Sequence, residues 1–456
     1  MELLEQIQKA IEEKATQLII TGSGVLPSDI GKLTHLTTLV LDRGRDYFGG
    51  ISAIPPEIGL LNNLQALTID SHNFPGLPKE IGELEQLQSL EIHCSELKEL
   101  PGELGLLSNL KSLYIGGDSF STLPVEICEL KNLQSFEIWC KSLTTLPGEL
   151  GQLSNLTALK ITYSSLETLP TELGNLKNLQ TLKFRSDRLK TLPGELGQLS
   201  SLTSLEIQCD NLATLPSELG ALKNLQSFNI WCNSLQTLPG ELSKLSNLTS
   251  LEIIGGSLQN LPPEIGQLSN LTSLAITGHS LQNLPPEVGN LIHLKKLHMK
   301  CPNLITLPIE ICLLEELDME DSNLGGQEQS MFVKNRKSLI LRFPNMKELP
   351  TKFDLLTNLS SLNLDCKNLQ KLPEELGNLN NLFSLNINCE NLPNLPDELG
   401  KLHNLKKIWI RFGGTESIQL PFDFHKLKML RTVKVSSSKR RTVQFLANAV
   451  SINRLC

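Results

Sequence analysis

The stretch LTSLEIQCDNLATLPSELGALKN, residues 202–224, is one copy of a unit that recurs along most of the chain. Its clearest mark is a Leu-Pro or Ile-Pro step that returns every 23 residues. The step falls at Pro55, Pro78, Pro101, Pro124, Pro147, Pro170, Pro193, Pro216, Pro239, Pro262, Pro285 and Pro308. It then loses phase and returns at Pro350, Pro373, Pro396 and, two residues out of step, Pro421. Chance does not produce so many steps in one register, so the chain is a repeat protein.

Each unit contains one segment of alternating polarity, such as Leu205-Glu206-Ile207. This alternation is typical of a β-strand whose successive side chains face opposite sides. One unit cannot enclose a core alone, but stacked units pair their strands in parallel and share one interior. With Leu202 as position 1, the leucines at positions 1, 4, 6 and 11 should line that interior. The sequence therefore predicts an α/β solenoid with a parallel sheet on the concave face and short 3₁₀ or turn segments on the convex face.

An asparagine precedes the first leucine of most units. The set is Asn109, Asn132, Asn155, Asn178, Asn224, Asn247, Asn270, Asn358, Asn381 and Asn404. An asparagine at this place is predicted to bond backbone groups of the neighbouring coil, as a buried loop requires. Four of them also match the motif N-L-[ST], and we interpret those matches as part of the repeat rather than as glycosylation sites.

These features resemble the short, cytoplasmic type of leucine-rich repeat found in Ras-group and bacterial Roco-type arrays, over about residues 15–436. The segment 11–41 is similar to the opening of the Roco arrays, which precede a Ras-like GTPase domain. No G-x-x-x-x-G-K-[ST] motif occurs here, since Gly31-Lys32 and Gly400-Lys401 are both followed by leucine. The resemblance implies a curved horseshoe that binds other proteins.

The sequence departs from that family at position 9, where the family carries asparagine. In the units from 87 to 270 only Asn233 conforms; the others have Ser95, Asp118, Lys141, Ser164, Asp187, Asp210 and Gly256. We therefore expect the family's ladder of asparagine hydrogen bonds to be interrupted at those positions.

Both ends of a solenoid expose its interior unless something covers them. In residues 1–14, the side chains of Leu3, Ile7 and Ile11 fall on one helical face, which predicts an N-terminal capping helix. The apolar pattern of TVQFLANAVSINRL predicts a second cap over 437–456. Between them, 15–436 is predicted to be the solenoid, with an irregular part at 312–345 where the period is lost.

Most cysteines occupy position 8, which strand alternation places on the same side as the core residues at positions 4 and 6. The set at position 8 is Cys94, Cys140, Cys209, Cys232, Cys301, Cys366 and Cys389. We predict that these are small buried hydrophobic residues in a reducing compartment. A cross-link between neighbouring coils, Cys209–Cys232 or Cys366–Cys389, is the alternative.

All three tryptophans occupy position 5 or 7, which alternation places on the other side of the strand, on the open concave face. Exposed aromatic side chains on a rigid surface are typical of a protein-binding patch. Basic and apolar residues at neighbouring positions extend this patch. The predicted partner-binding residues are Tyr114, Trp139, Lys160, Lys183, Arg185, Trp231, Ile254 and Trp409. The competing interpretation is a surface aromatic that only packs on its neighbours.

The formal net charge of −8 disfavours a nucleic-acid-binding surface. No apolar run approaches the about 20 residues that span a bilayer, and no metal-ligand, cofactor or catalytic spacing is present. The sequence therefore predicts a cytoplasmic, non-catalytic scaffold that binds a protein partner, with no cofactor and an oligomeric state left open. The alternatives are a bacterial effector delivered into a host cell, where it would regulate a host signalling protein, and, less favoured, an enzyme.

Overall fold

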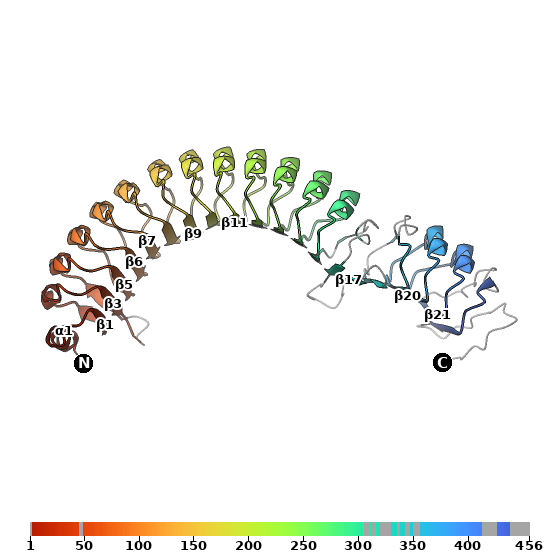
Figure 1. Ribbon diagram of the computed structural model, residues 1–456, viewed down its shortest axis with the longest axis horizontal. Helices are drawn as coiled ribbons and strands as arrows, with labels where there is room; N and C mark the ends of the chain where they lie inside the picture. The colour runs from red at the N-terminus through yellow and green to blue at the C-terminus, as the bar shows by residue number, and fades with distance from the viewer. Residues whose placement is uncertain are drawn as a thin grey trace. The chain divides into compact units, whose positions relative to one another are not determined.

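Coils of one strand and one 3₁₀ segment build this chain (Figure 1). The computed structural model describes residues 2–44, 49–301, 303–304, 311, 316–319, 330–334, 338–342, 347–349, 356–412 and 426–437. The chain divides into two units, Met1–Cys232 and Asn233–Cys456.

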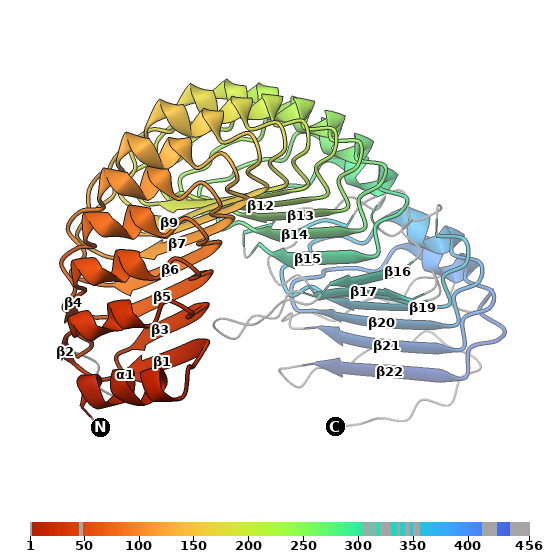
Figure 2. The same cartoon turned by 60° about the vertical axis from the view of Figure 1, so that its left-hand side comes forward.

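The strands of the first unit form one parallel sheet, stacked one coil above another (Figure 2). They are, in sheet order, β1 (Gln17–Thr21), β3 (Thr38–Asp42), β5 (Ala66–Ser71), β6 (Ser89–Cys94), β7 (Ser112–Gly116), β8 (Ser135–Trp139), β9 (Ala158–Ser164), β10 (Thr181–Ser186), β11 (Ser204–Gln208) and β12 (Ser227–Trp231). From β5 onward, paired residues such as Thr181 and Ser204 are 23 positions apart, except Ser164 and Ser186, which are 22 apart. A separate small sheet pairs β2 (Gly24–Val25) with β4 (Ile51–Ala53).

Alternation along each strand separates the core from an open face. In β11, Leu205 and Ile207 are buried, while Ser204, Glu206 and Gln208 are only half-buried. The sheet lies on the inner side of the first unit and the 3₁₀ segments on its outer side (Figure 1). The predicted solenoid with a parallel sheet and short 3₁₀ segments is therefore confirmed.

Each 3₁₀ segment begins directly after the repeat proline. In the first unit these segments are η1 (Ser28–Lys32), η2 (Pro56–Leu60), η3 (Lys79–Glu83), η4 (Gly102–Leu106), η5 (Val125–Glu129), η6 (Gly148–Gln152), η7 (Thr171–Asn175), η8 (Gly194–Gln198) and η9 (Ser217–Ala221). Pro147 precedes η6 with φ −66° and ψ 139°. The proline ring favours this φ, and the missing N–H costs nothing here because the chain has left the sheet.

Asparagine side chains tie each coil to the one before it, as predicted. The Nδ2 atoms of Asn109, Asn132, Asn155, Asn178, Asn224, Asn270, Asn381 and Asn404 donate to backbone oxygens 24 residues earlier at 2.7–2.8 Å. These bonds satisfy carbonyl groups of the loops that enter the strands.

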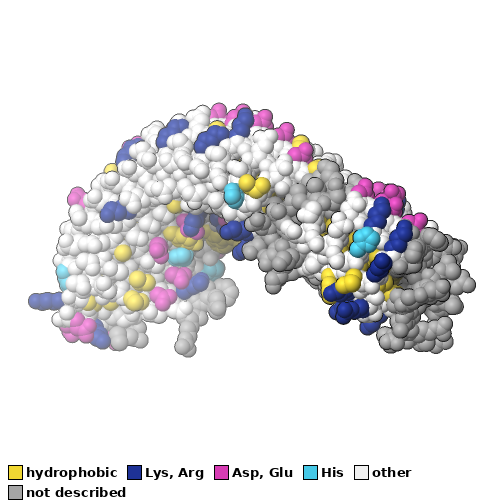
Figure 3. All heavy atoms as spheres, turned by 45° about the vertical axis from the view of Figure 1, so that its right-hand side comes forward, with side chains coloured by type: hydrophobic (Ala, Val, Ile, Leu, Met, Phe, Trp, Pro, Cys, Tyr) yellow, Lys and Arg dark blue, Asp and Glu magenta, His cyan; other side chains and the backbone are white. Residues whose placement is uncertain are grey.

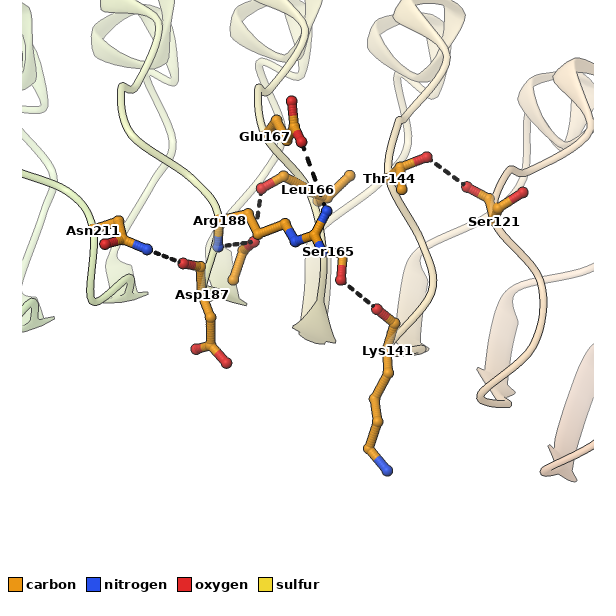
Figure 4. A network of polar contacts seen from close by, with 10 residues as sticks. Ser121, Lys141, Thr144, Ser165, Leu166, Glu167, Asp187, Arg188 and Asn211 are labelled. Carbon is orange, nitrogen blue, oxygen red and sulfur yellow. Dashed lines mark hydrogen bonds and ion pairs between the residues drawn. The ribbon is translucent and has the colours of Figure 1, made fainter.

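A second ladder runs through the loops that leave the strands (Figure 4). Here the side chain at position 10, not position 9, donates to the position 9 carbonyl of the preceding coil. Ser165 Oγ donates to Lys141 O at 2.7 Å, and Asn211 Nδ2 donates to Asp187 O. Ser119, Ser142, Ser280 and Asn303 make the same bond. Lys141 and Asp187 at position 9 can therefore replace asparagine, because only their backbone oxygens take part.

The helix α1 (Leu3–Glu12) packs beside β1 and η1, with Ile7 and Ala10 buried (Figure 2). Gln6 pairs with the outer edge of β1: its Nε2 donates to Thr21 O, and its Oε1 accepts from Thr21 N, both at 3.0 Å. One amide side chain thus takes the place of a missing neighbouring strand.

Replacing Gln6 by alanine should lower the free energy of unfolding by about 1 kcal/mol, since two partly exposed hydrogen bonds are lost. Urea denaturation would measure this. Gln8 is an exposed glutamine of the same helix, so Gln8→Ala is the matched control and should change little. Equal effects of the two variants would contradict the edge-pairing role.

The second unit continues the pattern with one interruption. Its strands are β13 (Ser250–Ile254), β14 (Ser273–Thr277), β15 (Lys296–Lys300), β16 (Glu316–Met319), β17 (Ser330–Lys334), β18 (Ser338–Arg342), β19 (Ser361–Asp365), β20 (Ser384–Cys389), β21 (Lys407–Phe412) and β22 (Thr432–Ser437). Its described 3₁₀ segments are η10 (Gly240–Lys244), η11 (Pro263–Gln267), η12 (Pro286–Asn290), η15 (Glu374–Asn378) and η16 (Asp397–Lys401). β17 pairs antiparallel with both β16 and β18, within the predicted irregular part 312–345. Of the predicted C-terminal cap, 438–456 lies outside the described residues.

The cysteines predicted to face the core are all buried, and none of them forms a disulfide. This holds for Cys94, Cys140, Cys209, Cys232, Cys301, Cys366 and Cys389, and Cys128 in η5 joins them. Burial raises the pKa of Cys94 to about 12 and that of Cys128 to about 11. A thiol that is both buried and protonated is a poor nucleophile.

A thiol reagent should therefore label these eight cysteines slowly in the native protein at about pH 8, and fast after denaturation. Peptide mapping would identify each labelled residue, including Cys312 and Cys456, which lie outside the described part of the chain. Rapid native labelling of Cys140 or Cys232 would overturn the inward orientation.

Candidate functional site

The open face of the first unit carries six of the predicted partner-binding residues. Tyr114 lies on β7, Trp139 on β8, Lys160 on β9, Lys183 and Arg185 on β10, and Trp231 on β12. Trp231 is 36% exposed, and the other five are half-buried among their neighbours. All six point away from the core, as strand alternation predicted.

Three of these strands bring together a group of rings and one guanidinium. The Trp139 and Tyr163 rings meet edge to face with centroids 5.6 Å apart. The Arg185 guanidinium lies 4.3 Å from the centre of the Tyr163 ring. We call Trp139, Tyr163 and Arg185 the Trp139 cluster. Lys141 Nζ lies 5.4 Å from the centre of the Trp139 ring, which gives the cluster a basic border.

Tyr163 reaches the open face through a local break in the strand. It occupies position 8, where neighbouring coils carry the buried Cys140 and Ser186. Pairing between β9 and β10 shifts there, so that Ser164 and not Tyr163 lies opposite Ser186. Ser164 is buried, while Tyr163 has φ 55° and is 44% exposed. A tyrosine is too large for a cysteine slot in a packed core, so a β-bulge turns it outward.

Tyr163 is not among the predicted partner-binding residues, because strict alternation would place position 8 inside. The available signal was its size: a large aromatic stands where the neighbouring units have cysteine or serine.

The charged residues of the open face neutralise one another between coils. Lys160 Nζ lies 3.4 Å from Glu137 Oε2, and Lys183 Nζ lies 2.9 Å from Glu206 Oε1. Lys160 and Lys183 are opposite each other in the sheet. The predicted basic residues Lys160, Lys183 and Arg185 therefore lie on adjacent strands, but the two lysines have acidic partners and only Arg185 is directed to a ring.

Tyr114 forms a second, smaller aromatic contact on this face. Its ring centroid lies 4.4 Å from that of His93. Gly116 leaves room for the ring, because a Cβ there would lie 3.0 Å from Tyr114 Cε1. Burial raises the pKa of Tyr114, with Glu137 and Glu91 adding to the effect.

Trp231, Ile254 and Trp409 complete the predicted set. Trp231 ends β12 and lies opposite Gln208 of β11 in the pairing. Ile254 on β13 and Trp409 on β21 belong to the second unit. Ile254 is half-buried, and Trp409 is 50% exposed with Lys434 Nζ 5.9 Å from its ring centre.

The described part of the chain contains neither a candidate metal site nor a candidate membrane-spanning helix. No group of three or more His, Cys, Asp or Glu side chains is placed to hold a metal ion there. No helix within the same ranges is long and apolar enough to cross a membrane.

Comparison with known proteins gives one consistent result. A family model described as a leucine-rich repeat region matches residues 4–115, 58–168, 102–212 and 149–257. A leucine-rich repeat protein of Leptospira interrogans is 29% identical, with a TM-score of 0.57 over 94% of this chain and 98% of that chain. The plant peptide hormone receptor RGFR1, solved with RGF2, is 23% identical, with a TM-score of 0.52 over 91% of this chain and 77% of that chain. No curated protein sequence matches the chain.

Proposed function

This chain belongs to the leucine-rich repeat family, and on that premise we propose that it is a non-catalytic scaffold that binds a protein partner on the open face of its first unit. The Trp139 cluster is the observation that carries this proposal. Tryptophan, tyrosine and arginine are the residue types that dominate binding energy at protein interfaces.

The cluster is already arranged before any partner binds. Trp139 holds the Tyr163 ring by an edge contact, and Arg185 lies over that ring. Because the side chains start in place, less conformational entropy is lost when a partner covers them. The bulge at Tyr163 also stores backbone strain, since a φ of 55° is unfavourable for tyrosine. Such strain is concentrated at functional positions in proteins.

The charges of this face favour a protein surface of mixed polarity. Lys160 and Lys183 are compensated by Glu137 and Glu206, so no strong field of one sign surrounds the rings. A partner can bury the aromatic centre while its own polar groups meet the paired charges at the rim, which is the usual anatomy of an interface.

The buried cysteines support a scaffold rather than an enzyme. Burial and protonation remove the thiols from the set of possible nucleophiles. None of the eight described cysteines is therefore available as a nucleophile for covalent catalysis.

The test is capture of partners from a lysate of the source organism, followed by quantitative mass spectrometry. The immobilised proteins are the wild type, Trp139→Ala, Trp231→Ala and Glu149→Ala, the last on the outer side in η6. A partner of this face should be retained by the wild type and by Glu149→Ala, and reduced about tenfold or more by Trp139→Ala. Proteins captured equally by all four would contradict the assignment.

A further inference from the structure

The C-terminal coils of the second unit differ in charge from the rest of the chain. The described stretches 401–412 and 426–437 contain eight Lys or Arg residues and no Asp or Glu, in a chain of net charge −8. These residues are Lys401, Lys406, Lys407, Arg411, Lys426, Lys428, Arg431 and Lys434. Figure 3 shows basic and hydrophobic side chains gathered on this part of the second unit.

Part of this charge lies on the open face of the sheet, around a tryptophan. Lys407, Trp409 and Arg411 alternate along β21, and all three side chains are exposed. Lys434 on β22 is also exposed and lies opposite Trp409 in the pairing. We call Lys407, Trp409, Arg411 and Lys434 the basic face.

Among the described residues, the cations of the basic face have no acidic partners of their own. No described carboxylate lies within ion-pair distance of Lys407, Arg411 or Lys434. The preceding strand β20 offers only the neutral side chains Asn386 and Asn388, and Asn388 already donates to Asp365. In the first unit, by contrast, each of Lys160 and Lys183 meets a glutamate from an adjacent coil.

We propose that the basic face is a second docking surface, which binds an acidic segment of a partner protein in an extended conformation. The segment has the pattern acidic–x–apolar–x–acidic. This surface is independent of the Trp139 cluster, and the proposal does not rest on the function assigned to the first unit.

The geometry of a strand selects this pattern. Alternate residues on one face of a strand are about 6.6 Å apart, and Lys407, Trp409 and Arg411 are successive alternate residues of β21. An extended segment that lies along β21 has the same repeat. Its two carboxylates then meet Lys407 and Arg411, and its apolar side chain covers the indole of Trp409. Arginine adds a two-pronged hydrogen bond to one carboxylate.

A short acidic segment fits better than a long polyanion. The net charge of −8 repels nucleic acid or an anionic lipid surface at long range. A short segment interacts mainly with the charges within a Debye length, about 10 Å at 0.1 M salt. In the sheet, Trp409 lies between the neutral Asn386 on β20 and the cationic Lys434 on β22. The single tryptophan of the basic face also gives only one platform for stacking, where single-stranded nucleic acid uses several.

The test uses the full chain and a fluorescein-labelled, amidated peptide with the core Glu-Ser-Leu-Ser-Glu. Fluorescence anisotropy at about 50 mM and about 300 mM salt measures binding and its screening. The face variant carries Lys407→Glu and Arg411→Glu. The matched control carries Lys401→Glu and Lys428→Glu, two exposed residues outside the strands that make the same change in net charge.

The wild type and the control should bind the peptide alike, with weaker binding at the higher salt. The face variant should bind about tenfold or more weakly, since both ion pairs become repulsions. Trp409→Ala should weaken binding by about fivefold, and Trp139→Ala should leave it unchanged. A peptide with glutamine in place of both glutamates should bind poorly to the wild type and to every variant.

Several outcomes would overturn the proposal. One is the absence of peptide binding by the wild type, and another is an equal loss in the face and control variants, which would mean attraction by net charge alone. Tighter binding of oligothymidylate or phosphatidylserine vesicles than of the peptide, abolished by the same face variant, would assign the surface to nucleic acid or membrane instead.

Discussion

Gly151→Ala is expected to lower the free energy of unfolding by about 3 kcal/mol, because one methyl group would collide with the backbone of the next coil. Gly151 lies in η6 and is buried against η7. A Cβ at this residue would lie 2.2 Å from the carbonyl oxygen of Glu172. That distance is far inside van der Waals contact, and a backbone atom held by its own coil cannot move aside cheaply.

Gly148→Ala provides the control within the same 3₁₀ segment. The atoms nearest to a Cβ there belong to the carboxyl end of the Glu172 side chain, 3.2 Å away, and a flexible side chain can turn away. We expect an effect within about 0.5 kcal/mol of zero, since the loss of glycine also restricts the unfolded chain. Urea denaturation of the two variants in parallel makes the comparison, and equal midpoints would contradict the close-approach argument.

Cys128 shows what the repeat position of Gly151 holds in the preceding coil. It is the residue 23 positions before Gly151, and it is buried in η5 with a side chain. The stack can therefore accept a side chain at this repeat position when the surrounding coils are built around it. If Gly151→Ala costs well below about 1 kcal/mol, then η6 and η7 can move apart enough to accept a side chain, as the coils around Cys128 do.

The parts of the fold that could be predicted are those that every coil repeats. Leu205 and Ile207 are buried because alternation along a strand fixes the direction of each side chain once the phase is known. The same phase placed Cys140 inside and Trp231 outside. The inward or outward direction of these side chains follows from the period, because a shift of one residue in phase would expose a whole row of leucines.

The parts that could not be predicted are those where one coil differs from its neighbours. Tyr163 faces outward although its position is an inward one, because the strand bulges there. The loop ladder moved from position 9 to position 10, where the short side chain of Ser165 reaches the neighbouring carbonyl. Alternation carries no information about either event, since each depends on the volume and reach of particular side chains.

Trp139→Ala should weaken binding of the captured protein partner by about 2 kcal/mol or more, which is about thirtyfold in the dissociation constant. The indole supplies its own contact area, and its loss also releases the Tyr163 ring that it holds by an edge contact. Stability should change by less than about 1 kcal/mol, because Trp139 lies on the open face rather than among the core leucines. Isothermal titration and urea denaturation measure the two quantities separately.

Tyr163→Gly separates binding from stability more sharply still. Glycine adopts a φ of 55° without strain, so this variant should unfold at the same or a slightly higher urea concentration than the wild type. It removes the ring that lies between Trp139 and Arg185, and binding should fall by about 1 to 2 kcal/mol. In the double variant with Trp139→Ala, the losses should be smaller than their sum by about 0.5 kcal/mol or more, because the two rings act together. If Trp139→Ala and Tyr163→Gly bind normally and only Trp139→Ala unfolds more easily, the indole is a structural support for its coil and the partner binds elsewhere.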